Sequence, residues 1–195
     1  MTGTFKGTFE GNSSEGNNDI FLVKLNSSFK IQWIKTIGGS LREREPRVVV
    51  DQDNGVYLLG SYADSCVFED NKYLISKGDY DIFLAKYGTD GFLKWTKNIA
   101  SFPSSQRCSD IDITEDNDLI ITGFYTDSIS FNDTNIVSSG TNNFYSKIDT
   151  HTWKKKIEKN LDVLNKTTTS SEDRSYKNTT KYHCMYFFLL ILCFI

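Results

Sequence analysis

The sequence predicts an all-β protein made of antiparallel strands in repeated units. A stretch of the chain, DIFLAKYGTDGFLKW at 81–95, occurs almost intact at 19–33 as DIFLVKLNSSFKIQW, and self-similarity at a long fixed period indicates a repeat architecture. Apolar runs rich in β-branched and aromatic residues alternate with clusters of Asp, Asn and Gly, which is typical of strands joined by tight turns. No window shows sustained helical periodicity, and we place Pro46 and Pro103 in loops.

The repeat period is about 62 residues. Recurring positions at an offset of 62 are Asp19/Asp81, Phe21/Phe83, Lys24/Lys86, Trp33/Trp95 and Ile37/Ile99, and at an offset of 63 they are Val48/Ile111, Val50/Ile113, Gly60/Gly123, Tyr62/Tyr125 and Phe68/Phe131. A third copy begins at Asn142 and keeps Phe144 and Lys147, while the segment 3–5 resembles the segment 60–62. The chain therefore holds about two and a half units.

Each unit contains four main strands in two hairpins. The first hairpin turns at 51–55 and the second at 89–91, and the connection between them carries one further weak strand, CVFE or SISF. Four antiparallel strands per unit predict a blade of a β-propeller, which buries its apolar faces against neighbouring blades. We expect Trp33 and Trp95, with Phe21 and Phe83, to be buried at equivalent positions between blades.

The predicted domain organisation has three zones. The propeller repeats span 1–158, as a partial blade at 1–40, a blade at 41–100 and a degenerate blade at 101–158, and they do not close a ring. A polar, Ser-, Thr-, Asn- and Lys-rich segment at 159–183 predicts a disordered linker.

A short hydrophobic tail follows at 184–195. Its run MYFFLLILCFI is shorter than the roughly 20 residues that a membrane-spanning helix needs. A cleaved lipid-anchor signal, a membrane-associating end and a non-native end are the alternatives, and we favour the last. Membrane association is expected only through this tail.

Composition excludes some classes of function. A net charge of −3 and a pI near 5.4 give no general attraction to nucleic acid, so we expect no nucleic-acid partner. Cys66, Cys108, Cys184 and Cys193 form neither a CxxC pair nor a zinc-binding pattern, which favours free thiols. The first residues, MTGTFKGTFEG, lack the basic and apolar regions of a signal peptide.

Several motifs together carry a family resemblance. The string TGFYTDSISF, a connection ending in Gly, the run DIFLAKY, a TDG turn, a Trp and the segment 37–39 (Ile-Gly-Gly) resemble the SBBP-type β-propeller repeats of bacterial secreted and surface proteins, over about residues 3–157. The resemblance implies a closed ring of blades, generally without a known activity, at an extracellular or cell-surface location. A ring takes typically four to eight blades, so further blades or other copies are needed to close it, and we favour the hypothesis that the chain is a fragment.

Two sets of residues resemble parts of known kinds of binding site. The turn containing Asp51, Asp53 and Gly55 resembles the start of a calcium loop but lacks a later acidic ligand, so we interpret it as a hairpin turn capped by Asp and Asn side chains. A ring formed by Lys24, Lys86 and Lys147 could line an anion site, but recurrence in a repeat more often reflects strand geometry, and we expect these lysines to be solvated or to snorkel to the surface. Asp19 and Asp81 are expected to cap the starts of strands or to pair with a neighbouring blade.

The residues for catalysis are few. His151 and His183 do not recur in the repeats, and neither has a nucleophile or a metal ligand at a spacing typical of a catalytic or metal site. No P-loop or dinucleotide-binding motif is present. We therefore predict that the chain is not an enzyme, and we assign no catalytic, cofactor-binding or metal-binding residue and no cofactor. The charged segment 41–47, LREREPR, shares only its final Arg with the corresponding SFPSSQR and is expected to be a solvated rim.

The predicted function is that of a non-enzymatic binding or structural module of a surface or secreted protein, with an unknown protein or glycan ligand. One alternative is a lectin-like propeller that binds carbohydrate through exposed Tyr62, Tyr73 and Tyr125. The other is a fragment of a propeller enzyme whose active site lies outside this chain.

Overall fold

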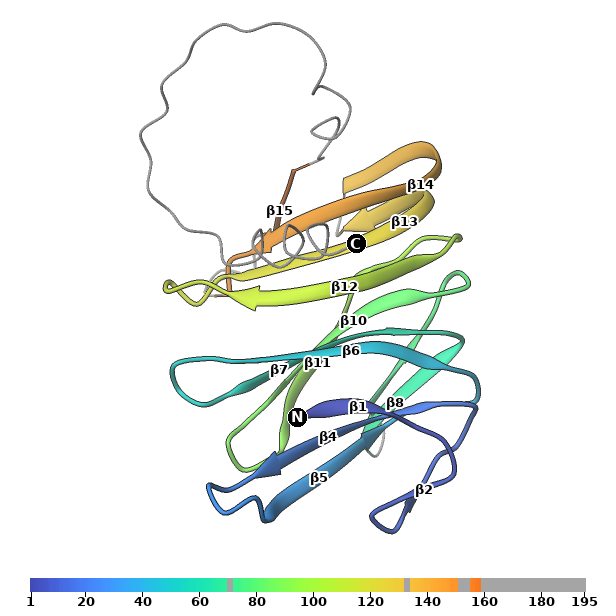
Figure 1. Cartoon of the computed structure of the whole chain (residues 1–195). Helices are drawn as coiled ribbons and strands as arrows, with labels where there is room; N and C mark the ends of the chain where they lie inside the picture. The colour runs from blue at the N-terminus through green and yellow to red at the C-terminus, as the bar shows by residue number, and fades with distance from the viewer. Residues whose placement is uncertain (70–71, 132–133, 151–154, 159–195) are drawn as a thin grey trace, which may run out of the picture. The chain divides into compact units, whose positions relative to one another are not determined.

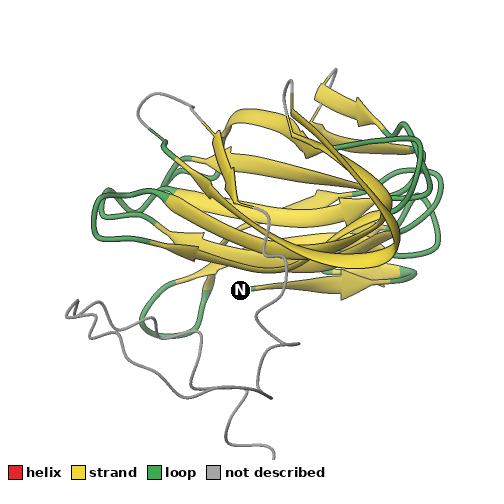
Figure 2. Ribbon diagram, turned by 90° about the horizontal axis from the view of Figure 1, so that it is seen from above, coloured by secondary structure: helices red, strands yellow, loops and turns green. Residues whose placement is uncertain are grey.

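The computed structural model describes residues 1–69, 72–131, 134–150 and 155–158 (Figure 1). The chain divides into two units, Met1–Leu161 and Asp162–Ile195, and only the first contains described residues. The predicted linker at 159–183 and tail at 184–195 lie outside them. Within the described ranges all regular structure is β-strand, with no helix (Figure 2). The predicted all-β class is therefore confirmed.

The described residues form three antiparallel sheets of three or four strands and two separate two-stranded sheets, and none of them closes on itself. Sheet 1 has the order β1(Thr2–Phe5), β4(Asp19–Leu25), β5(Ile31–Ile37); sheet 2 has the order β6(Glu43–Val50), β7(Val56–Tyr62), β10(Asp81–Tyr87), β11(Leu93–Ala100); and sheet 3 has the order β12(Gln106–Ile113), β13(Leu119–Phe131), β14(Thr134–Ile148), β15(Lys155–Glu158). Sheet 2 lies between sheets 1 and 3 (Figure 1). Sheet 1 has one strand fewer than the other two, because no strand pairs with the outer edge of β1 within the described residues.

A hairpin is inserted at the same place in every sheet, between the two strands that carry the recurring Gly and Phe. In sheet 1 it is β2(Thr8–Phe9) with β3(Asn12–Ser13), and in sheet 2 it is β8(Ser65–Glu69) with β9(Lys72–Ile75). In sheet 3 the far ends of β13 and β14 pair with each other to form it. The expectation of one weak strand per connection was wrong, since a second strand pairs with it and satisfies its backbone N–H and C=O groups.

The recurring glycines and phenylalanines are cross-strand neighbours. Gly3 pairs with Phe21, Gly60 with Phe83 and Gly123 with Phe144. In all three pairs the Phe ring lies over the glycine, where a Cβ would stand 2.6–2.7 Å from ring carbons. An aromatic ring that covers a strand glycine restores the packing that the missing side chain would have given. The shared spacing thus records one packing motif used three times.

Two hydrophobic clusters form the core, one on each face of sheet 2. Ile20, Leu22 and Ile37 of sheet 1 pack with Leu58 and Phe83 of sheet 2. On the opposite face, alternate residues of sheet 2 pack against sheet 3; this cluster includes Tyr57, Leu59, Leu84, Ile111 and Ile121. The alternation follows from the two-residue period of a strand, and it leaves sheet 2 covered on both faces.

The tryptophans occupy equivalent positions but are only half-buried. Trp33 pairs with Lys24 and Trp95 with Lys86 in the strand registers. Each packs at the margin of its cluster, and Trp95 lies 6.0 Å from Tyr57, centroid to centroid. The predicted equivalence is therefore confirmed, but the predicted burial is only partial, because both residues lie near the turn ends of β5 and β11, where the sheets leave the rings partly in solvent.

Candidate functional site

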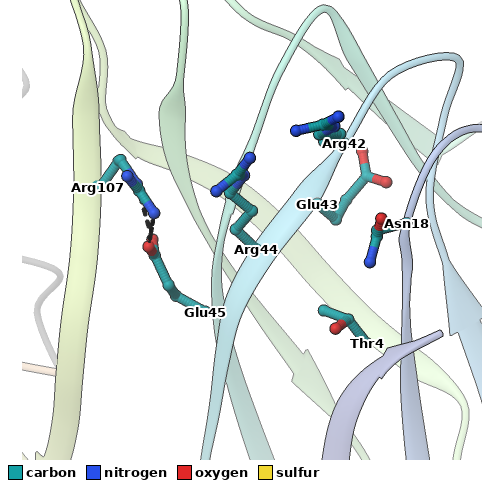
Figure 3. Close-up of a pocket in the computed structure, with 7 residues that line it drawn as sticks. All are labelled: Thr4, Asn18, Arg42, Glu43, Arg44, Glu45 and Arg107. Atoms are coloured by element: carbon teal, nitrogen blue, oxygen red, sulfur yellow. Dashed lines mark hydrogen bonds and ion pairs between the residues drawn. The ribbon is translucent and has the colours of Figure 1, made fainter.

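A polar cavity lies where the beginning of β6 meets β1 and β12. Its volume is about 340 Å³, and its lining residues are Thr4, Asn18, Arg42, Glu43, Arg44, Glu45 and Arg107 (Figure 3). Thr4 comes from sheet 1, Arg107 from sheet 3, and the central residues from sheet 2. We call this space the arginine cavity.

A β-bulge aims the side chains of β6 into the arginine cavity. The register with β7 shifts between Arg44 and Arg47, and Glu45 adopts a φ of 54°. Pro46 is at this bulge, where its missing N–H breaks no ladder hydrogen bond. Pro46 therefore lies inside a strand, not in the predicted loop.

The segment 41–47 is not simply the solvated rim that its alternating charges predicted. It enters β6 at Glu43, whose side chain is fully buried. No other side chain in the described residues donates a hydrogen bond to either carboxylate oxygen of Glu43. Burial, together with the nearby Asp19 carboxylate, raises the pKa of Glu43 to about 8, against the opposing effect of the backbone N–H groups of Gly39 and Glu43.

Glu45 and Arg107 form the ion pair of the arginine cavity. Arg107 Nε donates to Glu45 Oε2 at 3.2 Å, and a second guanidinium nitrogen contacts Oε1. The Ser61 hydroxyl donates to the same Oε2 at 3.2 Å. The Arg107 guanidinium also lies over the rings of Tyr80 and Phe124, 5.6 and 5.3 Å from their centroids. Glu45 is thus held by one donor from β7 and one cation from β12.

Arg44 has no such carboxylate. Its guanidinium stands 5.5 Å from the centroid of Tyr80. It forms no ion pair within the described residues, and its buried Nε has no hydrogen-bond partner there. A buried donor without a partner costs roughly 1–3 kcal/mol, so this arginine would be stabilised by an acceptor that the described residues do not supply.

Register shows which residues of the two sheet junctions correspond. Arg44 pairs with Ser61, and Arg107 pairs with Phe124, which is the repeat counterpart of Ser61. Arg107 therefore corresponds to Arg44, not to Arg47 as the sequence comparison of the two loops suggested. The offset of 63 that relates Val48 to Ile111 also relates Arg44 to Arg107, because β12 has its own register shift at the equivalent place, between Cys108 and Asp110.

Gln106 corresponds in the same way to Glu43, and it too is fully buried. Its Nε2 donates to Ser104 Oγ at 2.8 Å and to the Ser128 carbonyl at 3.1 Å, and its Oε1 accepts from Phe102 N at 2.9 Å. At this position the contact between sheets 2 and 3 has a neutral amide whose hydrogen bonds are all made, whereas the contact between sheets 1 and 2 has a carboxyl group. The raised pKa of Glu43 agrees with a neutral group being preferred there.

The recurring lysines do not converge on one anion site. Lys86 Nζ donates to Asp51 Oδ2 at 2.8 Å and to Tyr57 Oη at 2.9 Å, and Lys147 pairs with Asp118 at 2.8 Å. Lys24 donates to the Thr89 carbonyl at 2.9 Å. Each lysine therefore holds a nearby turn, and Lys86 is half-buried in an ion pair instead of being merely solvated.

Asp51 caps the turn that begins with it, as predicted. Its Oδ1 accepts from Asp53 N at 3.0 Å and from Gly55 N at 2.7 Å. Burial alone would raise its pKa, but the hydrogen bonds from Lys86 and Gly55 outweigh burial, and the pKa is lowered. Across the described ranges, no cluster of three or more His, Cys, Asp and Glu side chains could hold a metal ion.

Asp19 and Asp81 are buried caps of the loops before their strands. Asp19 accepts from Glu15 N and Asp81 from Lys77 N, both at 3.0 Å, and Asp81 also accepts from Asn98 Nδ2 at 2.9 Å. In sheet 3 Asn142 takes this place and donates to the carbonyls of its own loop. The capping alternative is therefore the correct one for these residues.

Two of the three tyrosines proposed for carbohydrate binding are not exposed. Tyr62 and Tyr125 are 0% and 2% exposed, because both face the hydrophobic clusters, and only Tyr73 is exposed. The prediction that Tyr62 and Tyr125 lie on the surface was wrong.

Cysteines and histidines add nothing to the cavity. Cys66 and Cys108 are free and buried, and burial raises the pKa of both thiols. Their predicted free state is therefore confirmed. Cys184 and Cys193, like His151 and His183, lie outside the described residues.

Neither a family model nor a curated protein matches this sequence. The described residues contain no helix that is long and apolar enough to cross a membrane. The arginine cavity and the packing motifs of the sheets are therefore the basis on which a function is proposed.

Proposed function

We propose that the chain is a non-enzymatic β-propeller-type module that binds an acidic group of a ligand or partner in the arginine cavity. The resemblance to SBBP-type repeats supports the propeller architecture and a place in a secreted or surface protein. The repeated strand order with an inserted hairpin supports it independently. In such a ring further blades, or other copies, would close the circle.

The observation that carries the acidic-ligand proposal is the difference between Arg44 and Arg107. Arg107 has a carboxylate, Glu45, while its counterpart Arg44 has none among the described residues. Guanidinium groups bind carboxylates through short, charge-assisted hydrogen bonds. With Arg107 neutralised by Glu45 and Glu43 favouring its neutral form, Arg42 and Arg44 leave the cavity with positive charge.

A titration followed by two-dimensional amide NMR tests this proposal. We expect N-acetylglutamate α-amide to shift backbone signals of Thr4, Asn18 and Arg44, and its neutral analogue N-acetylglutamine α-amide to shift them far less. The variant Arg44→Gln should lose the response. The variant Arg47→Gln, whose exposed side chain pairs with Asp110 at 3.8 Å, should keep it. Equal responses to both compounds, or an unchanged response in Arg44→Gln, would contradict the proposal.

A further inference from the structure

We propose that the open edge of β1 is a docking site for an extended segment of another polypeptide. The segment adds antiparallel to sheet 1, places a carboxylate side chain in the arginine cavity and places an apolar side chain, four residues later, in a second cavity. This inference rests on the proposed function and names the kind of partner that its site receives. Strand addition to a free sheet edge is a common mode of peptide recognition.

The first support is that the edge of β1 has free backbone groups. Met1 and Val23 exchange two backbone hydrogen bonds, both of 2.9 Å. Hydrogen-bonded and non-hydrogen-bonded pairs alternate along an antiparallel ladder. Gly3 and Phe5 therefore bond to β4, while the N–H and C=O groups of Thr2 and Thr4 point away from it. No described strand pairs with that side.

The second support is an occupied copy of the same position in sheet 2. There β6 pairs with β7 through Arg44 and Ser61 and through Arg47 and Leu59. Ser61 and Leu59 are the counterparts of Thr4 and Thr2, because they flank Gly60 as Thr4 and Thr2 flank Gly3, and each glycine pairs with the recurring Phe of its sheet. The residues of β1 that point outward are thus those whose counterparts hold the first strand of sheet 2, so the incoming strand has a defined register.

Charge complementarity gives the third support. In the junction of sheets 2 and 3, Glu45 of β6 binds Ser61 and Arg107. In the junction of sheets 1 and 2, the equivalent partners are Thr4 and Arg44, and both line the arginine cavity. A carboxylate at the position of Glu45 in an added strand would reach these two residues. It would supply the acceptor that Arg44 lacks.

A second cavity, of about 370 Å³, lies at the other end of the same edge. Its lining is mainly apolar and includes Met1, Trp33 and Val48. In β6, Val49 follows Glu45 by four residues and packs into the cluster between sheets 2 and 3. An added strand with the same spacing would bring an apolar side chain to this second cavity. The two cavities together therefore select an acidic residue followed four positions later by an apolar one.

The occupant is not β6 of a second copy, because that strand is already paired with its own β7. It is a segment that is free to extend. The sequence of residues 41–51, LREREPRVVVD, serves as a probe because it carries the required side chains in the required register. A fluorescently labelled synthetic peptide of this sequence is titrated with the full chain, and binding is followed by fluorescence anisotropy.

We expect saturable binding that weakens at least 10-fold for the variant Thr4→Pro. Proline at this position removes an outward N–H without removing a hydrogen bond to β4. The variant Arg44→Gln should weaken binding of the wild-type peptide but not of a peptide in which the position of Glu45 is Gln. Arg47→Gln should bind as the unmodified chain does. Circular dichroism and thermal melts of each variant separate loss of binding from loss of folding, and Arg44→Gln retains the test if Thr4→Pro fails to fold.

Three outcomes overturn the inference: no binding of the peptide, binding that Thr4→Pro leaves unchanged in a folded protein, or a Glu-to-Gln change in the peptide that has the same effect with and without Arg44. If N-acetylglutamate α-amide still shifts the cavity signals while the peptide fails to bind, the strand-addition inference falls and the acidic-ligand proposal stands. If neither binds, both fall.

Discussion

One structural position takes an acidic side chain where sheets 1 and 2 meet and a neutral amide where sheets 2 and 3 meet. Glu43 and Gln106 occupy the same place in consecutive sheets, and both are fully buried. The amide of Gln106 makes three hydrogen bonds to its surroundings. A carboxylate in such a place would be desolvated beside a second acid, Asp19, and this is why the pKa of Glu43 is raised.

This difference predicts a pH-dependent stability. The folded state keeps a proton on Glu43 up to about pH 8, whereas the unfolded chain releases it near the ordinary value of 4.5. The folded state binds more protons over that interval, so the free energy of unfolding falls as pH rises from about 4.5 to about 8 and then levels off. The variant Glu43→Gln should lack this decline and be more stable than the unmodified chain at pH 8.5, by about 1–3 kcal/mol.

Urea unfolding at pH 5 and at pH 8.5 measures both parts of this prediction. The reverse variant, Gln106→Glu, is the matched control, and it should acquire a second decline of the same sign. An unmodified chain that is equally stable at both pH values would show that Glu43 ionises without cost.

At the scale of elements, the repeat depends on glycine and phenylalanine side by side on neighbouring strands. Sequence predicted these strands, their hairpins and their equivalence, because apolar alternation and turn residues are local signals. It did not predict that Gly60 recurs in order to lie beneath Phe83, since that contact joins β7 and β10 across the inserted hairpin. The arginine cavity was missed for a related reason, because the register of Arg44 depends on a bulge and the burial of Glu43 depends on sheet 1.

Substitution of the strand glycines tests the packing motif. In Gly60→Ala the new Cβ would stand 2.6 Å from the ring of Phe83, which is fully buried and has no room to move. We expect a loss of about 1–3 kcal/mol in the free energy of unfolding, as for other overpacked cores. Gly3→Ala meets Phe21 at 2.7 Å, but that ring is half-exposed and can turn toward solvent. Equal losses for the two variants, measured by urea unfolding, would refute this account.

The turns allow a similar comparison. Asp51 accepts two backbone hydrogen bonds and pairs with Lys86, whereas Thr114, in the equivalent turn of sheet 3, accepts one from Asp118 N at 3.0 Å. Asp51→Ala should therefore cost about 1–3 kcal/mol, because it also removes the carboxylate that pairs with the half-buried Lys86. Thr114→Ala should cost less. Thermal melts of the two variants at pH 7 measure both losses of stability. A larger loss for Thr114→Ala than for Asp51→Ala would contradict this prediction.

On the scale of the whole first unit, sheet 2 is the element that both clusters share. Its residues alternate between the cluster with sheet 1 and the cluster with sheet 3. Sheet 1 contributes to one cluster only, and no strand among the described residues pairs with its edge at β1. Since each sheet is stabilised mainly by its neighbours, the stability of this unit should be graded from sheet 2 outward.

Hydrogen exchange of the full chain measures that gradient. Backbone amides of β10 have strands on both sides and apolar packing on both faces, so they should open only with global unfolding and exchange slowest. Amides of β4 should exchange faster, and the outward N–H groups of Thr2 and Thr4 fastest within sheet 1. The strongest check is the addition of the 41–51 peptide, which should slow exchange at Thr2 and Thr4 and leave β10 unchanged. If β4 were protected as long as β10 without the peptide, the unit would unfold as one block and the graded stability would be refuted.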